Sequence, residues 1–411
     1  MMRIEALEGW TKAQRNVVIA SFLGWTLDAF DYFLLVFVLK DIAGEFHTQI
    51  AEVTVALLLT LAMRPIGAFI FGRAADRWGR RPTLVVDVLC YSIIEFASGF
   101  APNLAILLVL RALYGIAMGG EWGVGASLTM ETIPPKARGI ISGLLQSGYP
   151  TGYFIASIVY GALFSVIGWR GMFMVGVVPA LLVLYIRRHV PESPSWRPTR
   201  KAQGGTVAVL KSHWRLGIYA VVLMTGFNFF SHGTQDLYPT FLEVEHRLSP
   251  HAVGIIAVIY NIGAIIGGIV CGALSEKIGR RRMIVICALL SLPILPLWAF
   301  SSSAAMLALG AFLMQIMVQG AWGVIPVHLN ELSPGDVRGT FPGFVYQLGN
   351  LLAAANATIQ AEIATSHGGN YGLALAIIAG TVAVVIALLT AFGPEAKGVT
   401  FQSERAPSFA E

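Results

Sequence analysis

Long apolar runs recur along the whole chain and are separated by short polar breaks. Each run has about 20 residues, the length that a helix needs to cross the hydrocarbon core of a bilayer. Most breaks carry Pro, Gly or charged residues, as in the segments 101–103 and 333–335. The pattern predicts twelve membrane-spanning helices at about residues 17–39, 51–72, 83–101, 104–130, 139–165, 171–188, 216–240, 251–274, 283–301, 304–330, 339–365 and 371–392.

One connection between the predicted helices is long. Residues 189–215 are polar and basic, with three prolines and the pair Gly204–Gly205. We interpret this segment as a cytoplasmic linker between two halves. The predicted organisation is a six-helix half at 1–188, the linker at 189–215, a second six-helix half at 216–393 and a cytoplasmic tail at 394–411.

Composition supports a membrane protein. The 411 residues are 56% hydrophobic and only 12% charged, whereas a soluble domain has about 25% charged residues. This excludes a soluble globular protein, a disordered chain and a secreted disulfide scaffold. Cys90, Cys271 and Cys287 lie in apolar runs without metal-ligand spacing, so we expect buried thiols, no metal and no cofactor.

The basic residues fix the expected orientation. If both termini are cytoplasmic, the opposite side carries only Lys40, Arg170 and Arg247, and the helices contain Arg64 and Arg111. The other 23 of the 28 Lys and Arg residues are then cytoplasmic, as positive charge in membrane proteins usually is. We therefore expect a multi-pass protein of the plasma (cell inner) membrane. The net charge of +5 has a topological cause and predicts no nucleic-acid partner.

The chain resembles itself at an offset of 200 residues. Residues 72–81 align with 272–281, and the two segments share the Gly-Arg-Arg ending. The matches continue without a gap through the following residues: Gly120, Trp122, Gly123, Val124, Glu131, Pro134, Arg138, Gly139 and Gly143, with their counterparts 200 positions later. Two parallel six-helix halves are therefore predicted, with a substrate path between them.

Several of these segments resemble the motifs of one superfamily. Residues 72–81 are similar to the loop signature of the major facilitator superfamily, and the copy at 272–281 is expected there. Residues 111–115 resemble its fourth-helix motif, and 191–194 its sixth-helix exit motif. The resemblance implies an all-α polytopic membrane protein with twelve transmembrane helices, which transports its substrate by alternating access.

The repeated loop also contains a repeated acid. Asp76 and Glu276 stand where a carboxylate can meet the positive N-terminus of a neighbouring helix or an arginine. Candidate partners are Arg138 and Arg338, which lie at the starts of the fifth and eleventh predicted helices. We predict a cytoplasmic latch that holds the outward-open state, formed by Asp76, Arg80, Arg138, Glu276, Arg280 and Arg338. The alternative is that these charges only set the topology.

The seventh predicted helix contains the most polar string of the chain. Asn228, His232, Gln235 and Asp236 follow the spacing i, i+4, i+7, i+8 and share one helical face. Such a face is costly in lipid, so it should line a wet cavity. His232 and Asp236 are one turn apart and can share a proton.

This string resembles a signature of the sialate:proton symporter family, in its lactate and short monocarboxylate permease branch. The signature is matched at Asn228, Ser231, His232, Thr234, Gln235, Asp236 and Thr240. The resemblance implies uptake of a carboxylate together with a proton. The sialate branch usually has extra spans in the middle, so the short connection at 189–215 favours the smaller monocarboxylates.

Charged residues inside the predicted helices are candidates for coupling and binding. Asp31, and then Asp28, are proposed proton sites of the first half, unless they form structural ion pairs with Arg64 or Arg111. A carboxylate substrate is well bound by a guanidinium fork. Arg64 is our candidate for that fork, with a paired structural arginine as the alternative. For Arg111 we expect a structural or coupling role.

Polar residues of the eleventh predicted helix complete the candidate site. Gln347 and Asn350 share a face and could donate hydrogen bonds to a hydroxy acid. The alternative is polar packing between helices. Asp87, Glu95 and Glu121 are further acids within predicted spans, to which the sequence assigns no role.

The sequence therefore predicts a secondary active transporter and no enzyme. Its substrate would be a small monocarboxylate such as lactate or pyruvate, taken up with protons. Symport of another organic acid (sialate, an aromatic acid) or of a sugar is the alternative. An exporter, a membrane-embedded enzyme and a sensor have less support, because residues 148–152 only partly match the exporter motif and no paired nucleophile and base recurs. We expect a monomer in the bilayer.

Overall fold

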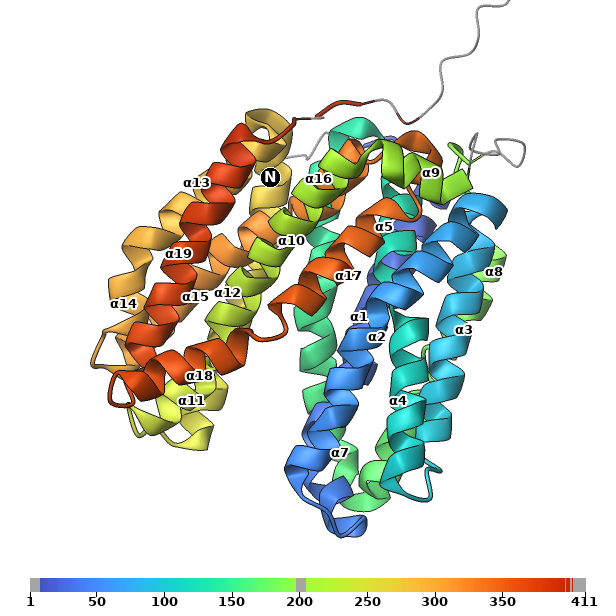
Figure 1. The fold of residues 1–411 in the computed structure, drawn as a ribbon. Coiled ribbons are helices and arrows are strands. Elements are labelled where there is room, and N and C mark those ends of the chain that lie inside the picture. The colour runs from blue at the N-terminus through green and yellow to red at the C-terminus, as the bar shows by residue number, and fades with distance from the viewer. Residues whose placement is uncertain (1–7, 197–204, 396, 400, 402–411) are drawn as a thin grey trace, which may run out of the picture.

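The computed structural model describes residues 8–196, 205–395, 397–399 and 401. Within these residues the secondary structure is helical, and the helices gather in two lobes (Figure 1). The first lobe contains α1 (Lys12–Glu45), α2 (Ile50–Trp78), α3 (Arg80–Ser98), α4 (Leu104–Met118), α5 (Glu121–Thr132), η2 (Pro135–Ala137), α6 (Arg138–Gln146), α7 (Gly148–Val175) and α8 (Ala180–His189).

The second lobe repeats this order of long helices. It contains α10 (Trp214–Gln235), α11 (Tyr238–Val244), α12 (Pro250–Ile278), α13 (Arg280–Ser291), η3 (Leu292–Ile294), α14 (Leu295–Ala299), α15 (Ala304–Trp322), α16 (Ile325–Leu332), η4 (Gly335–Val337), α17 (Phe341–Ala353), α18 (Asn356–Ser366) and α19 (Tyr371–Phe392). The short helix α9 (Gly205–Ser212) lies in the predicted linker. Residues 197–204 of that linker, and most of the predicted tail, fall outside the described residues.

Nine helical stretches of the described chain are long and apolar enough to cross a membrane. One of them, Pro135–His189, has 55 residues and contains a non-helical glycine, Gly168, with φ 62° and ψ −175°. It corresponds to the fifth and sixth predicted spans. The third and eleventh predicted spans, which are α3 and α17–α18, are not among these nine stretches.

Several spans that the sequence predicts as single helices are interrupted. The fourth divides at Gly119–Gly120 into α4 and α5, and the tenth divides at Gly323 into α15 and α16. The seventh divides at Asp236 into α10 and α11. Breaks of this kind expose backbone groups inside a bundle, which membrane proteins tolerate where the chain is buried or lines a cavity.

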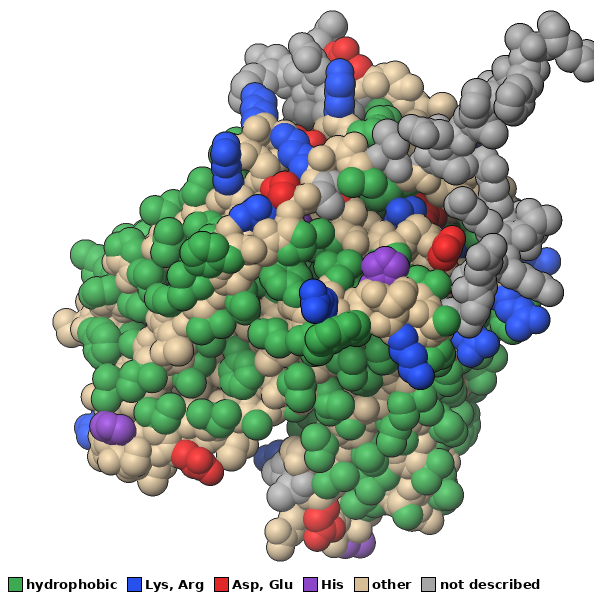
Figure 2. All heavy atoms as spheres, turned by 45° about the horizontal axis from the view of Figure 1, so that its top comes forward, with side chains coloured by type: hydrophobic (Ala, Val, Ile, Leu, Met, Phe, Trp, Pro, Cys, Tyr) green, Lys and Arg blue, Asp and Glu red, His purple; other side chains and the backbone are tan. Residues whose placement is uncertain are grey.

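The surface separates into an apolar belt and one basic end. Large apolar side chains such as Val166, Leu181 and Phe392 are 65–87% exposed on the outer faces of their helices, as lipid-facing side chains are. Figure 2 shows this apolar surface on both lobes, with Lys and Arg gathered at the end that contains the loop between α2 and α3. We call this end the basic end.

The lobes are joined at the basic end. Helix α12 packs against α6, and α17 packs against α2. Gly139 of α6 and Gly272 of α12 are so close that a Cβ on Gly272 would lie 2.5 Å from the carbonyl oxygen of Gly139. At the opposite end a notch separates the two lobes (Figure 2). The structure is therefore closed at the basic end and open at the other.

Candidate transport site

The site is centred on the predicted polar face of α10. His232 Nδ1 lies 3.2 Å from Asp236 Oδ1, and His232 Nε2 lies 3.3 Å from Asn350 Oδ1 of α17. The side chains of His232 and Asp236 are 32% and 40% exposed. His232 stands about 27 Å along α10 from its start at the basic end. Solvent therefore reaches this pair from the open end of the molecule.

The two contacts of His232 suit a proton carrier. A protonated imidazole donates from both nitrogens, to the Asp236 carboxylate and to the Asn350 amide oxygen. When the proton leaves, a rotated Asn350 amide can donate to the free ring nitrogen instead. The geometry accommodates both protonation states without moving a helix.

Helix α15 brings two glutamines that sequence reasoning did not select. Gln235 donates to the amide oxygen of Gln315 at 2.9 Å, Gln315 donates to Thr234 at 3.0 Å, and Gln319 donates to Ser231 at 3.2 Å. The sequence contains a signal for them: two glutamines four residues apart in an apolar run share one helical face, which indicates a polar surface inside the bundle. They extend the predicted face of α10 into a network of amides and hydroxyls.

Arg64 approaches from the other lobe. It is 3% exposed on α2. Its Nη2 lies 2.7 Å from Met118 Sδ, its guanidinium stands 5.4 Å from the ring of Tyr32, and its Nε has no hydrogen-bond partner. Asp28 and His232 are both within its electrostatic reach. A buried guanidinium with free donors can receive a carboxylate.

The two acids of α1 are buried without partners. Asp28 and Asp31 are 0% exposed, and none of their four carboxyl oxygens accepts a hydrogen bond from a described residue. Arg111 pairs instead with Glu95, at 2.6 Å, an acid to which the sequence assigned no role. The alternative of a direct ion pair between Asp28 or Asp31 and an arginine is not what the geometry shows.

Two further candidates occupy the same region with different surroundings. Asn228 is 2% exposed and donates to the carbonyl of Met224 at 2.8 Å, so its amide is engaged by its own helix. Gln347 is 1% exposed, and its side-chain oxygen has no partner among the described residues. Gln347 therefore keeps a free acceptor, and Asn228 keeps its amide oxygen and its second N–H for a ligand.

An aromatic layer lies between the site and the basic end. The rings of Trp122 and Tyr346 are 4.7 Å apart, and those of Trp322 and Tyr346 are 5.6 Å apart. The two tryptophans are equivalent in the repeat and come from different lobes. Tyr346 precedes Asn350 by about one turn of α17 on the side of the basic end. The layer closes the path from the site to that end.

Beyond this layer the repeated acids bind helix N-termini of the opposite lobe. Asp76 accepts hydrogen bonds from the backbone N–H groups of Gly339 and Thr340, at 2.7 and 3.0 Å, and from the Thr340 hydroxyl at 2.6 Å. Glu276 accepts from the backbone N–H of Gly139 at 2.7 Å. The predicted helix-terminus contacts are therefore present twice.

The repeated arginines add ion pairs around these acids. The same scheme holds in each lobe: an arginine pairs with the acid one turn before it and with a glutamate of its own lobe, which also pairs with an arginine of the other lobe. The distances are Arg80–Asp76 3.2 Å, Arg80–Glu131 3.1 Å, Arg338–Glu131 3.6 Å, Arg280–Glu276 2.6 Å, Arg280–Glu331 3.0 Å and Arg138–Glu331 3.9 Å.

A residue of the predicted tail joins this network. The ring of Phe401 is 7% exposed and lies 3.7 Å from the Arg138 guanidinium and 4.1 Å from that of Arg338. Arg138 also donates to the carbonyl of Val399 at 2.9 Å. The aromatic ring thus contacts both lobes at once, which nothing in the sequence indicated.

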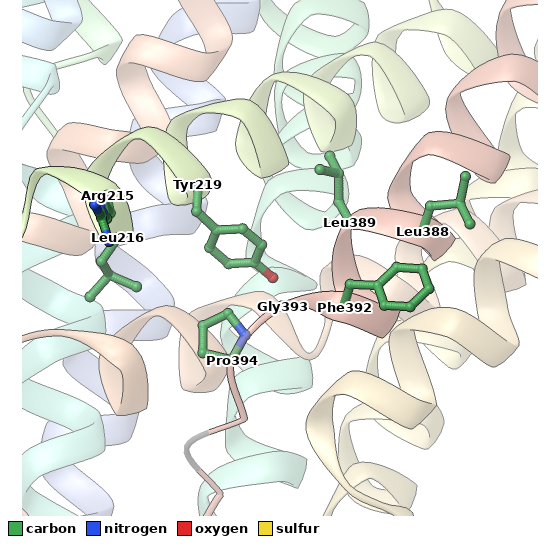
Figure 3. A pocket seen from close by; sticks show the side chains of 8 residues that line it. All are labelled: Arg215, Leu216, Tyr219, Leu388, Leu389, Phe392, Gly393 and Pro394. Atoms are coloured by element: carbon green, nitrogen blue, oxygen red, sulfur yellow. The ribbon is translucent and has the colours of Figure 1, made fainter.

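A separate cavity lies away from these groups. It occupies about 610 Å³ between the basic end of α10 and the last residues of α19 (Figure 3). Its wall is mostly apolar, with Leu216, Leu389 and Phe392, and contains none of the candidate site residues. We do not regard it as the transport site.

Comparison with known proteins identifies the family of the chain. The family model described as Major Facilitator Superfamily matches residues 21–248 and 236–410. The chain belongs to the major facilitator superfamily and is a membrane transporter of that superfamily. The predicted fold is confirmed.

Similar proteins include named carriers of organic acids. The chain is 31% identical over 415 residues to a carboxylic acid transporter protein homolog of Saccharomyces cerevisiae, covering 94% of this chain and 67% of that protein. It is 28% identical to the sialic acid transporter NanX of Escherichia coli, covering 95% and 96%. It is 29% identical to the cis,cis-muconate transport protein of Acinetobacter baylyi, covering 87% and 89%.

A solved structure shares the fold. The proton:xylose symporter XylE bound to 6-bromo-6-deoxy-D-glucose superposes with a TM-score of 0.77 and 18% identity, covering 95% of this chain and 98% of that chain.

Proposed function

We propose that the protein takes up a small monocarboxylate, such as lactate or pyruvate, together with a proton. The observation that carries the proposal is the cluster of His232, Asp236 and Asn350, which is open to solvent on one side and faces Arg64 of the other lobe. The resemblance of residues 228–240 to the signature of the lactate and monocarboxylate branch supports the same substrate class. So do the relatives whose names refer to carboxylic, sialic and muconic acids.

The arrangement suggests the order of events. A proton on His232 leaves a cation beside the polar face, and the substrate carboxylate binds between it and Arg64. The substrate carboxylate then balances the Arg64 guanidinium and Asp236 balances the protonated His232, so the lobes can rock about the bound substrate and proton. Opening of the latch at the basic end releases acid and proton on that side.

A larger or conjugated organic acid is the second candidate. Tyr32 and Tyr149 face Arg64, and Tyr149 stacks on Trp25 with ring centroids 5.6 Å apart. Such a wall can pack against a planar substrate. The relatives named for muconate and sialic acid point in the same direction.

Uptake into proteoliposomes tests the proposal. Labelled lactate should accumulate when the outside is acidified, and unlabelled pyruvate should compete. Sialic acid, cis,cis-muconate and xylose serve as competing probes for the alternatives. Lactate uptake at the same rate with and without the proton gradient would refute proton coupling. Strong competition by muconate alone would favour the second candidate.

Substitution of His232 links the activity to the site. His232→Ala should abolish proton-driven lactate uptake while the amount of protein in the membrane stays the same. His246→Ala, just after α11, is the matched control and should transport normally. Unchanged uptake by His232→Ala would remove the cluster from the mechanism.

We further propose a monomer with both termini on the cytoplasmic side of the cell inner membrane. The gathering of Lys and Arg at the basic end supports this orientation. In this orientation the structure is open to the outside, ready for uptake. A cysteine placed at exposed Asp336 should react with an impermeant maleimide only after the cells are permeabilised.

A further inference from the structure

Two fully buried carboxyl groups belong neither to the transport site nor to the network at the basic end. Asp87 of α3 is 0% exposed and Glu121, the first residue of α5, is 1% exposed. None of their four carboxyl oxygens has a hydrogen-bond partner among the described residues. The ion pairs found within the described chain do not include either residue.

These two groups converge with Asp28 from three helices. Glu121 Oε1 occupies the space that a Cβ on Gly24 would need, one turn of α1 before Asp28. Asp87 Oδ1 lies 2.9 Å from the position of a Cβ on Gly120. The glycines leave room for the carboxyl groups, so the close approach is built into the backbone. We call Asp28, Asp87 and Glu121 the acid cluster.

A tyrosine hydroxyl points to a ligand in the same place. Tyr91 is 0% exposed, and its hydroxyl has no partner among the described residues. It interacts electrostatically with all three members of the acid cluster. A buried hydroxyl donor without an acceptor is costly, and a proton shared between carboxyl groups or an enclosed water would satisfy it.

The charges around the cluster cannot balance three carboxylates. The titratable and charged groups that face it come from α1, α2, α3, α4 and α17: Asp31, Arg64, Cys90, Tyr91, Glu95, Tyr114 and Tyr346. Arg64 faces Asp28 and can compensate one negative charge. Unpaired ionised carboxylates in an apolar interior are strongly disfavoured. Among the described residues, no three His, Cys, Asp or Glu side chains are arranged to hold a metal ion.

We propose that the acid cluster is a second proton-binding site, loaded while the basic end is closed. The inference rests on the proposed symport and adds its stoichiometry: more than one proton is transported with each monocarboxylate. One proton travels with His232 and Asp236, and another is held by Asp87 and Glu121. The two protons and one anion together carry net positive charge inward.

The same helices connect this cluster to the closed end. Helix α5 carries Glu121 at its start and Glu131 near its end, where Glu131 pairs with Arg80 and Arg338. Helix α3 carries Asp87 and begins at Arg80. Separation of the lobes at the basic end breaks the pair of Glu131 with Arg338 of the second lobe and uncovers the side of α5 that faced that lobe. Water that enters between the lobes and reaches the cluster along α5 takes the proton from the carboxyl O–H group.

Infrared spectroscopy tests the protonation without any substrate. In purified protein near neutral pH, Glu121→Gln should remove absorption of a protonated carboxyl group, and Asp87→Asn should do so independently. Asp336→Asn, a change at an exposed acid, should remove only absorption of an ionised carboxylate. Loss of ionised carboxylate signal in both cluster variants would overturn the proposal.

Charge movement tests the role in transport. An interior-negative potential of about 59 mV corresponds to a tenfold change for one elementary charge. It should raise steady-state accumulation of labelled lactate about tenfold in wild-type proteoliposomes at a fixed pH gradient. Glu121→Gln should respond to the pH gradient but not to the potential, and Asp336→Asn should behave as wild type.

The outcomes separate the two proposals. A wild-type response that is independent of potential, or an equal response in Glu121→Gln, would refute the second proton. Failure of labelled lactate to exchange in wild-type counterflow, which needs no proton gradient, would refute the proposed substrate instead. In that case the infrared measurement still tests whether the acid cluster is protonated, because it needs no substrate.

Discussion

At the scale of single residues, Arg64 is the clearest test of substrate binding. Arg64→Lys keeps the charge but removes the planar fork that can bind both carboxylate oxygens. Loss of one charge-assisted hydrogen bond of about 1.5–3 kcal/mol predicts a KM for lactate about 10- to 100-fold higher. The measurement is initial uptake in proteoliposomes. Arg170→Lys, at the open end, is the control, and an unchanged KM in Arg64→Lys would assign Arg64 a structural role.

The pair of Glu95 and Arg111 is a test of stability. Both side chains are at most 1% exposed and lie 2.6 Å apart. Glu95→Gln leaves a buried guanidinium without its counter-charge, which should lower the free energy of unfolding by about 3–5 kcal/mol. Adding Arg111→Met should recover much of this loss. Thermal unfolding in detergent measures both.

The control for this prediction is an exposed pair of the same chemistry. Glu45 and Arg170 are 2.7 Å apart, but their side chains are 45% and 33% exposed. Glu45→Gln should therefore cost less than about 1 kcal/mol. Equal losses in Glu95→Gln and Glu45→Gln would show that burial does not govern these pairs.

Sequence spacing predicted the residue contacts that lie within one helix. His232 and Asp236 meet because they are one turn apart. The contact of His232 with Asn350 and the pairing of Gln235 with Gln315 join different helices. Spacing along one helix contains no information about the rotation of its neighbours, so these partners required the fold.

At the scale of elements, the internal repeat had the greatest predictive value. Gly79 and Gly279 have φ values of 110° and 107° and end α2 and α12 in the same way. The repeat continues at the ends of the lobes, where Glu192 accepts from the N–H of Arg81 and Glu395 from that of Arg281. The repeat did not predict the interruptions between α4 and α5 and between α15 and α16. The glycines at these positions could equally indicate close packing of uninterrupted helices.

The contact between Asp76 and the start of the eleventh span predicts the behaviour of the basic end. Asp76→Asn removes the negative charge that holds two backbone N–H groups and the Thr340 hydroxyl. A loss of about 1.5–3 kcal/mol should raise the population open at this end about 10- to 100-fold. A cysteine at Ser142, on a background without the three native cysteines, should then react faster with a maleimide added from that side.

The matched control is Asp336→Asn, which changes an exposed acid at the same end. It should leave the reactivity of the cysteine at Ser142 unchanged. If the cysteine at Ser142 reacts at the same rate in Asp76→Asn and in Asp336→Asn, the charges of this end only set the topology.

At the scale of the whole molecule, the sequence predicted the fold but not the state. Two lobes of six spans follow from apolar run length, the repeat and the long linker. Which end is closed depends on small free-energy differences between arrangements of the same lobes. Asp76 and Glu276 accept hydrogen bonds from the opposite lobe in this arrangement, and their role as a latch stays a prediction.

Phe401 allows a test of how the two lobes are held together. Its ring contacts Arg138 of the first lobe and Arg338 of the second, and these arginines must separate when the basic end opens. Each buried cation–π contact is worth about 0.5–2 kcal/mol. Phe401→Ala should therefore raise the reactivity of a cysteine at Ser142 about two- to thirtyfold, while Phe401→Tyr restores the wild-type rate. Phe392→Ala, which removes an 87% exposed ring on the outer surface, is the control. Equal rates in Phe401→Ala and the wild type would show that Asp76, Glu276 and their arginines hold the lobes without the ring.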